Sequence, residues 1–155
     1  MSGSCISGQA MQDASILVVD DNPDHLELIV MALYECCDPI EVATARDGVE
    51  ALDYLLGRGS QAGPPALPRV VLLDMKLVGM HGLDLLKALR ADPLTATLPV
   101  VMHSSSTEKR DIVACYEHGA NSYVRKATDY DELRRNMRRV HDFWLRVNES
   151  TRDTP

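Results

Sequence analysis

Five side chains that could bind a metal ion and a phosphoryl group each follow a short apolar run in the sequence. They are Asp20, Asp21, Asp74, Ser104 and Lys126. Carboxylate oxygens are the ligands that Mg²⁺ prefers, and this ion usually keeps several waters beside one or two carboxylates and phosphate oxygens. A lysine ammonium and a serine hydroxyl can bind the oxygens of a transferring phosphoryl group. If the fold brings the five together, they form a metal-assisted phosphoryl-transfer site.

Asp74 is the predicted nucleophile of this set. It stands alone after the most apolar run, whereas the adjacent Asp20 and Asp21 can share the metal ion. Three carboxylates about 5 Å apart repel by about 3 kcal/mol per pair at an effective dielectric constant near 20, so a site without a cation would be costly. Taken singly, each residue is more often a helix cap or a solvated side chain, and Ser104 could simply cap the next helix. The interpretation depends on their order at successive strand ends.

The elements that must position these side chains are short β-branched and apolar runs alternating with helical patterns. This alternation predicts an α/β fold with a parallel sheet and helices on both faces. The third run is continuously apolar, as expected for a central strand buried on both faces. In such sheets, ligands bind at the carboxyl ends of the strands. The predicted strands are residues 16–19, 40–43, 70–73, 100–103 and 122–125.

The helices predicted between these strands have recognisable ends. Asn22 is a predicted N-cap for the first helix, and Asp47 is predicted to open the second, which stops at Gly57. A surface excursion is expected at residues 57–68, which contain three Gly and three Pro. The remaining helices are predicted at residues 82–92, about 108–118 and about 130–149.

Length and composition indicate one ordinary globular domain. The chain has 155 residues, of which 45% are hydrophobic and 25% charged. We expect a disordered N-terminus at residues 1–13, the domain at 14–149 and a C-terminal tail at 150–155. The net charge of −7 argues against a nucleic-acid partner, although five arginines make the last helix locally basic.

The sequence lacks recognisable targeting signals and zinc-ligand spacing. There is no secretory signal, and no apolar run approaches the roughly 20 residues that span a bilayer. The four cysteines lack zinc-site or disulfide-scaffold spacing and are expected to be reduced, and the five histidines are interpreted as structural. A cytoplasmic protein without membrane association is therefore expected.

The motifs around these residues resemble those of a known family. The sequence is similar to the receiver domains of two-component response regulators over about residues 14–148. The match rests on ILVVDD at 16–21, LLDM at 72–75 with GMHG at 79–82, PVVMHS at 99–104 and YVRK at 123–126. The resemblance implies a flavodoxin-like, doubly wound sheet of five parallel strands in the order 2-1-3-4-5, with five helices. The segment 57–68 and DFWL at 142–145 look more narrowly like single-domain regulators paired with bacterial phytochromes.

The family resemblance also implies roles for individual residues. Asp74 would accept a phosphoryl group from the phosphohistidine of a sensor histidine kinase and later lose it by autodephosphorylation. Such a protein is a phosphoacceptor in a phosphorelay rather than an enzyme. Asp21, Asp74 and the backbone carbonyl of Lys76 would bind Mg²⁺ or Mn²⁺ directly, and Asp20 mainly through water. Ser104 and Tyr123 would be the switch pair.

Some positions depart from the family pattern. Ala127 follows Lys126 where the family usually has proline with a cis bond; a cis bond without proline costs about 2.5 to 4 kcal/mol, so the geometry of this bond is open. Ser104 replaces the commoner threonine but keeps the hydroxyl, and a register slip of one residue would put Ser105 in its place. The other departures are Val78 for proline and His81 for aspartate.

Output is expected to pass through an unidentified partner, because few residues follow the last predicted helix. That helix carries a long apolar stripe, and its first half is explained by core packing. Its far end, with Phe143 and Trp144, could overhang the domain. We therefore expect a homodimer through the surface made by the fourth helix, the fifth strand and the fifth helix.

Three alternative functions remain open. A flavin-binding module needs a hydroxyl- and glycine-rich phosphate loop, whereas Asp20 and Asp21 would repel the flavin phosphate. A metal-dependent phosphohydrolase needs a second acidic group two residues after its nucleophile, where this chain has Lys76. A degenerate receiver acting as a binding scaffold is disfavoured because all the residues of the predicted site are present.

Overall fold

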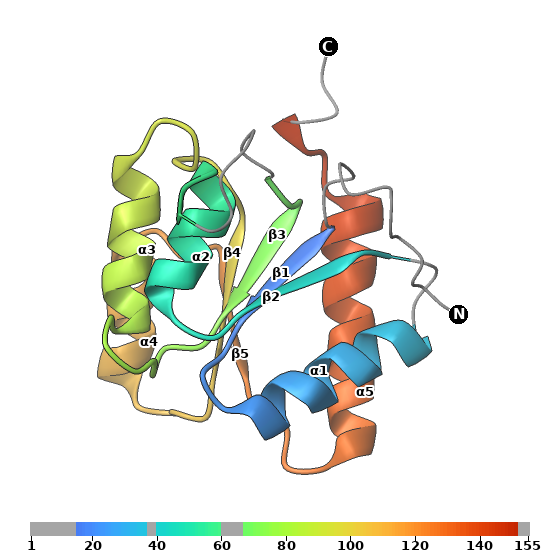
Figure 1. The fold of residues 1–155 in the computed structure, drawn as a ribbon. Helices are drawn as coiled ribbons and strands as arrows, with labels where there is room; N and C mark the ends of the chain where they lie inside the picture. Colours follow the sequence, from blue (N-terminus) through green and yellow to red (C-terminus); the bar gives the residue numbers. More distant parts are fainter. Residues whose placement is uncertain (1–14, 37–39, 60–66, 152–155) are drawn as a thin grey trace.

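The fold is known from a computed structural model that describes residues 15–36, 40–59 and 67–151. Five parallel strands form one sheet in the order β2-β1-β3-β4-β5 (Figure 1). This order confirms the predicted flavodoxin-like arrangement, with β3 at the centre. The strands are β1 Ile16–Val19, β2 Val42–Ala45, β3 Val70–Leu73, β4 Val100–Ser104 and β5 Ser122–Arg125.

Helices cover both faces of the sheet. In Figure 1, α1 and α5 lie on one side, and α2, α3 and α4 lie on the other. A six-residue π-helical segment, η3, continues from α5. The bounds are α1 Pro23–Cys36, α2 Gly48–Leu56, α3 Gly82–Ala91, α4 Lys109–Glu117, α5 Tyr130–His141 and η3 Asp142–Val147. No helix in the described ranges has both the length and the apolar character that crossing a bilayer requires.

The core divides into two clusters because side chains alternate across a strand. Leu17 and Val19 pack toward α2, α3 and α4, whereas Ile16 and Val18 pack toward α1 and α5. All four residues of β3 are buried, as the continuous apolar run predicts. The two faces hold the strand ends rigidly, so side chains that follow the strands are held in place.

Helix caps form where the sequence predicts them. Asn22 Oδ1 accepts hydrogen bonds from the amides of Asp24 and His25, at 2.9 and 3.2 Å. Asp47 Oδ1 accepts from the amide of Glu50 at 2.7 Å. These bonds satisfy amides that have no partner within the helix, so they fix where α1 and α2 begin.

Two predicted elements differ in the structure. The second strand is Val42–Ala45 rather than residues 40–43, because its pairing with β1 joins Ile16 to Val42 and Val19 to Ala45. The last α-helix ends at His141 rather than near residue 149. The chain continues as the π-helical segment η3, in which Trp144 packs against the core instead of overhanging it and Val147 is 65% exposed.

Parts of other predictions lie outside the described residues. The expected disordered segment at 1–13 is one, and residues 60–66 of the predicted excursion are another.

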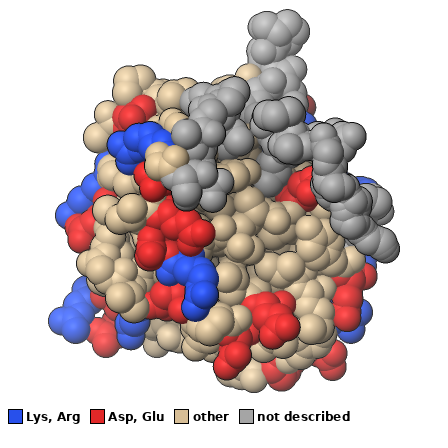
Figure 2. All heavy atoms as spheres, in the orientation of Figure 1, with Lys and Arg blue, Asp and Glu red and all other residues tan. Residues whose placement is uncertain are grey.

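On the described part of the face in Figure 2, acidic and basic side chains are interspersed without an extended basic area. That face therefore has no feature typical of a nucleic-acid surface.

Candidate functional site

Three carboxylates meet at the carboxyl end of the sheet. β1 and β3 are adjacent and in register, with Val19 beside Leu73, so the residues that follow them lie side by side. The amide of Asp74 continues the ladder by donating to Val19 O at 2.9 Å. Asp20, Asp21 and Asp74 each place a carboxylate oxygen within 4.8 Å of the others. The convergence on which the predicted site depends is therefore present.

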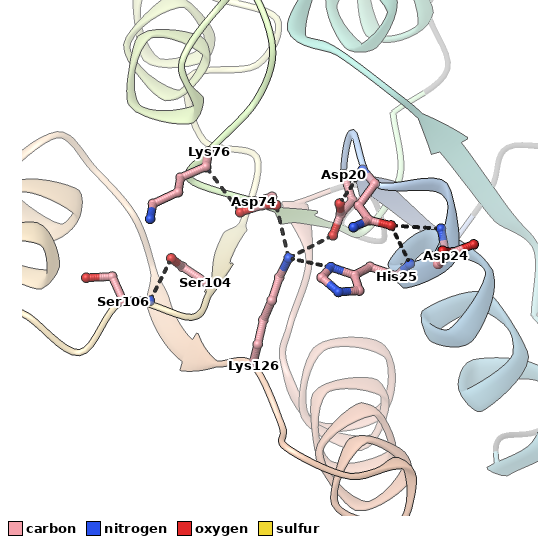
Figure 3. A network of polar contacts seen from close by, with 9 residues as sticks. Asp20, Asp24, His25, Asp74, Lys76, Ser104, Ser106 and Lys126 are labelled. Atoms are coloured by element: carbon pink, nitrogen blue, oxygen red, sulfur yellow. Dashed lines mark hydrogen bonds and ion pairs between the residues drawn. The ribbon is translucent and has the colours of Figure 1, made fainter.

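Lys126 closes this group of carboxylates from the side of β5. Its Nζ donates to Asp20 Oδ2 and to Asp74 Oδ2, both at 3.0 Å (Figure 3). Its backbone amide donates to Ser104 O at 2.8 Å, which fixes the start of the β5–α5 loop. No cis peptide bond occurs among the described residues, so the bond between Lys126 and Ala127, left open by the sequence, is trans.

Burial sets the protonation behaviour of the site. Asp74 is 7% exposed, and burial raises its pKa, although Lys126 and the amide of Lys76 oppose the shift. For Lys126, burial alone would lower the pKa, but the nearby carboxylates of Asp74 and Asp20 outweigh it and raise the pKa. Lys126 therefore stays charged at neutral pH, and the free carboxylate of Asp74 requires positive charge close by.

The donor set fits a small divalent cation. The three carboxyl groups outnumber the single ammonium of Lys126, so the site can accept further positive charge. Asp20 Oδ1 accepts from the amide of Asn22 at 2.9 Å, which holds that carboxylate in position. Asp21 is only half-buried, so water can reach the same point. Oxygen ligands with access to water are what Mg²⁺ or Mn²⁺ requires.

The loop after Asp74 is held close to α3. Gly82 donates its amide to Met75 O at 2.9 Å, and a Cβ on Gly82 would clash with the backbone oxygen of Asp74. Glycine is therefore required for this approach. The amide of Lys76 donates to Asp74 Oδ1 at 3.1 Å, while its side chain extends away from Asp74 (Figure 3). In this arrangement the backbone of Lys76, and not its side chain, contacts Asp74.

The predicted switch residues are joined through the loop between β4 and α4. Ser104 is 1% exposed, whereas Ser105 is exposed. The Ser104 hydroxyl accepts from the amide of Ser106 at 3.2 Å. Tyr123 donates its hydroxyl to the backbone oxygen of the same Ser106 at 2.8 Å.

Sequence reasoning missed some residues near the site. His25, interpreted as structural, places Nδ1 3.4 Å from Lys126 Nζ. Its position on the first turn of α1, three residues after the Asn22 cap, was the available signal. His103 is 3% exposed on β4, and within the described part of the chain its Nε2 has no hydrogen-bond partner. The contact between Ser106 and Tyr123 could not be found in the local sequence, because the two residues lie on separate elements 17 positions apart.

Comparison with known proteins identifies the family. Residues 16–138 match the model of the response regulator receiver domain. The chain belongs to the response regulator receiver domain family. Family membership agrees with the strand order and with the position of the acidic cluster, and receiver domains accept phosphoryl groups from histidine kinases. The chain is thus a signalling domain rather than a typical enzyme.

Individual relatives cover most of the receiver. The probable methanogenesis regulatory protein FilR2 of Methanothrix harundinacea is 34% identical over 135 residues, covering 87% of this chain and 86% of FilR2. Response regulator Rcp1 of Synechocystis sp. is 28% identical over 130 residues, covering 84% of this chain and 88% of Rcp1.

Solved structures of this receiver type are also similar. The crystal structure of the phosphorylated cyanobacterial phytochrome response regulator RcpA has a TM-score of 0.80 at 32% identity, covering 90% of this chain and 99% of that chain. The Mn(2+)-bound form of Rcp1 has a TM-score of 0.77 at 26% identity, covering 88% and 98%. The chain is thus structurally close to phytochrome-associated response regulators.

Proposed function

We propose that Asp74 accepts a phosphoryl group from the phosphohistidine of a sensor histidine kinase, with Mg²⁺ or Mn²⁺ at Asp20, Asp21, Asp74 and the carbonyl of Lys76. One observation carries the proposal: a buried carboxylate, two acidic neighbours and the Lys126 ammonium meet at one strand end. The Mn(2+)-bound structure of Rcp1 supports the choice of metal.

Each side chain of the site has a separate role in the proposed phosphoryl transfer. An Asp74 carboxylate oxygen forms a bond to phosphorus while the P–N bond of the phosphohistidine breaks and its electron pair returns to the leaving imidazole. The metal supplies charge neutralisation for the transferring group. Lys126, 3.0 Å from Asp74, is placed to bind a phosphoryl oxygen, and Ser104 can donate its hydroxyl to another.

The acyl phosphate then acts as a switch. A charge-assisted hydrogen bond from Ser104 to the phosphoryl group is worth about 1.5 to 3 kcal/mol, which shifts a two-state equilibrium roughly ten- to a hundredfold. Tyr123 shares Ser106 with Ser104, so it can respond to that bond. The surface formed by α4, β5 and α5 would carry the change to an unidentified downstream protein.

Intact mass tests the phosphoacceptor. Incubation with acetyl phosphate and MgCl₂ is expected to add one phosphoryl group to the wild type and none to Asp74→Asn. Asp84→Asn, an exposed aspartate on α3, is the matched control and should still gain the group. No gain by the wild type would favour the alternative, a degenerate receiver acting as a scaffold. Continuous phosphate release from a generic phosphomonoester would favour a phosphohydrolase.

The kinase partner is proposed to be a phytochrome. The similarity to RcpA over 90% of this chain supports this choice. Phosphotransfer from a phosphorylated phytochrome kinase should be faster than from an unrelated histidine kinase at equal concentration. Equal rates from both would remove the support for a phytochrome. A cytoplasmic location follows from this partnership, since the catalytic domains of sensor kinases use cytoplasmic ATP.

We also propose a homodimer through α4, β5 and α5. Val113 and Tyr116 on α4 are 41% and 48% exposed, and Phe143 after α5 is 47% exposed. Exposed large apolar side chains are available for an interaction with another chain. Light scattering at tens of micromolar protein, with and without acetyl phosphate, tests the proposal. A monomer under both conditions would contradict it.

A further inference from the structure

One residue of the β4–α4 loop, Ser106, contacts the end of β4, the start of α4 and Tyr123 on β5. Its amide donates to the Ser104 hydroxyl at 3.2 Å, and its backbone oxygen accepts from Tyr123 at 2.8 Å. Its own hydroxyl donates to Asp111 Oδ2 at 2.5 Å and accepts from the amide of Glu108 at 3.2 Å. The backbone of Ser106 therefore binds the switch pair, while its side chain binds the start of α4.

The bond between Ser106 and Ser104 leaves the Ser104 hydroxyl ready to act. A serine hydroxyl has one hydrogen to donate and two lone pairs that accept. Because the Ser104 oxygen accepts from the amide of Ser106, its hydrogen remains available for a phosphoryl oxygen on Asp74. Chains of hydrogen bonds polarise one another, so phosphorylation would strengthen the contact between Ser104 and Ser106.

At its other end, Ser106 takes the place of a helix cap. Glu108 is the N-cap residue of α4, and its side chain makes no capping bond in the structure. The first amides of a helix need acceptors from outside it. The Ser106 hydroxyl supplies one to Glu108 and at the same time binds Asp111 on the first turn. These two hydrogen bonds connect the start of α4 to the loop that contacts both switch residues.

We propose that the Ser106 hydroxyl, through Asp111, is the link by which a phosphoryl group on Asp74 moves α4 together with Tyr123. Ser106 is then a positioning residue and not a catalytic one, because its side chain does not touch the reacting atoms. The inference rests on the proposed function, since it requires phosphorylation of Asp74.

Hydrogen exchange with mass spectrometry on the full chain tests this link. The wild type, Ser106→Ala, Ser106→Thr and Thr107→Ala are compared with and without acetyl phosphate and MgCl₂. Loss of a hydrogen bond to a charged group predicts about tenfold faster exchange of the amides in the first turn of α4 in Ser106→Ala. The decisive quantity is the change on phosphorylation in α4 and in the peptide containing Tyr123. It should shrink in Ser106→Ala and be retained in Ser106→Thr, which keeps the hydroxyl, and in Thr107→Ala, an exposed neighbour.

The possible outcomes separate the inference from the proposed function. A Ser106→Ala protein that is phosphorylated and shows the wild-type change in α4 overturns the inference alone. So does faster exchange by the same factor in both forms, because that result is a purely structural effect. A Ser106→Thr protein that behaves like the alanine variant also overturns it. Intact mass of the same samples shows whether the wild type was phosphorylated; if it was not, the proposed function fails and the inference fails with it.

Discussion

Lys126 Nζ lies 3.0 Å from Asp74 Oδ2 although the two residues are 52 positions apart in the chain. The same ammonium lies 3.0 Å from Asp20 Oδ2, on the neighbouring strand. Both ion pairs are largely buried, with side chains 15% exposed for Lys126 and 9% for Asp74. The lysine therefore holds two carboxylates of the acidic cluster together and points at the proposed nucleophile.

Replacing Lys126 with alanine should slow phosphorylation of Asp74 by about a hundredfold, the usual cost of losing one preorganised donor to a transferring group. Intact mass against time with acetyl phosphate measures the rate. Lys87→Ala removes an exposed lysine on α3 and should leave the rate unchanged. A Lys126→Ala rate within threefold of the wild type would show that the lysine has no role in transfer.

Replacing Asp21 with asparagine should have opposite effects with and without metal. Without metal, one of three mutually repelling carboxylates is removed, so the free energy of unfolding should rise by about 1 kcal/mol. With MgCl₂, the wild type should gain more stability than the variant, because binding to the native state stabilises it in proportion to affinity.

Calorimetric Tm values in EDTA and in MgCl₂ check the Asp21 prediction. Glu117→Gln, an exposed residue of α4, controls for the loss of one negative charge. An equal Mg²⁺-dependent rise in Tm for the wild type and Asp21→Asn would mean that Asp21 does not bind the ion.

His103 should make the protein sensitive to acid. Its pKa is lowered from the ordinary 6.5 to about 4, mainly by burial and also by the positive charges of Lys126 and His25, although Asp20 opposes the shift. A base with a lowered native pKa contributes stability above pH 6.5 that is lost as the pH falls toward 4, because the unfolded chain takes up the proton first. Between pH 7 and pH 5 this loss amounts to roughly 2 kcal/mol.

His103→Val should therefore be less sensitive to pH over this window than the wild type. Valine suits a buried strand position and removes a buried nitrogen that has no partner among the described residues. Urea unfolding at pH 7, 6 and 5 measures the difference, with His118→Gln as the control for losing one histidine. Parallel pH curves for the wild type and His103→Val would contradict the assignment.

Arg90 should be a large contributor to stability away from the site. Its guanidinium donates to the backbone oxygens of Gly119, Leu98, Thr95 and Ala96, at 2.8 to 3.2 Å. Arg90→Ala removes all of these bonds and should cost about 2 to 4 kcal/mol. Arg90→Lys should recover only part of this, because an ammonium cannot match the planar fork. Urea unfolding measures the free energy of unfolding of each variant. A decrease below 0.5 kcal/mol for Arg90→Ala would contradict the prediction.

Local sequence was sufficient to locate much of the site. The continuous apolar run at 70–73 predicts a central strand because only a strand covered on both faces can bury every side chain. Asp74 then lies at its carboxyl end by chain connectivity alone. The Asn22 and Asp47 caps were also predictable, since capping depends on residues within one turn.

The register of β2 and the end of α5 were not predictable from local patterns. Residues 40–43 and Val42–Ala45 are both acceptable strand sequences, and only pairing with β1 selects the second. A 3.6-residue stripe continues past His141, but there Trp144 packs against the core within a π-helical turn. In both cases the free energy that decides comes from another element.

The sequence by itself determined which residue types stand at the strand ends, because the alternation of apolar and polar residues is a property of each segment alone. The tertiary structure decided the distances between them: Lys126 within 3.0 Å of Asp74, and Ser106 between Ser104, Tyr123 and Asp111. The contacts of Lys126 with Asp74 and of Ser106 with Tyr123 join segments far apart in the chain. They exist because packing of five strands and the helices on both faces fixes one relative position for each loop, and periodicity within a segment carries no information about that position.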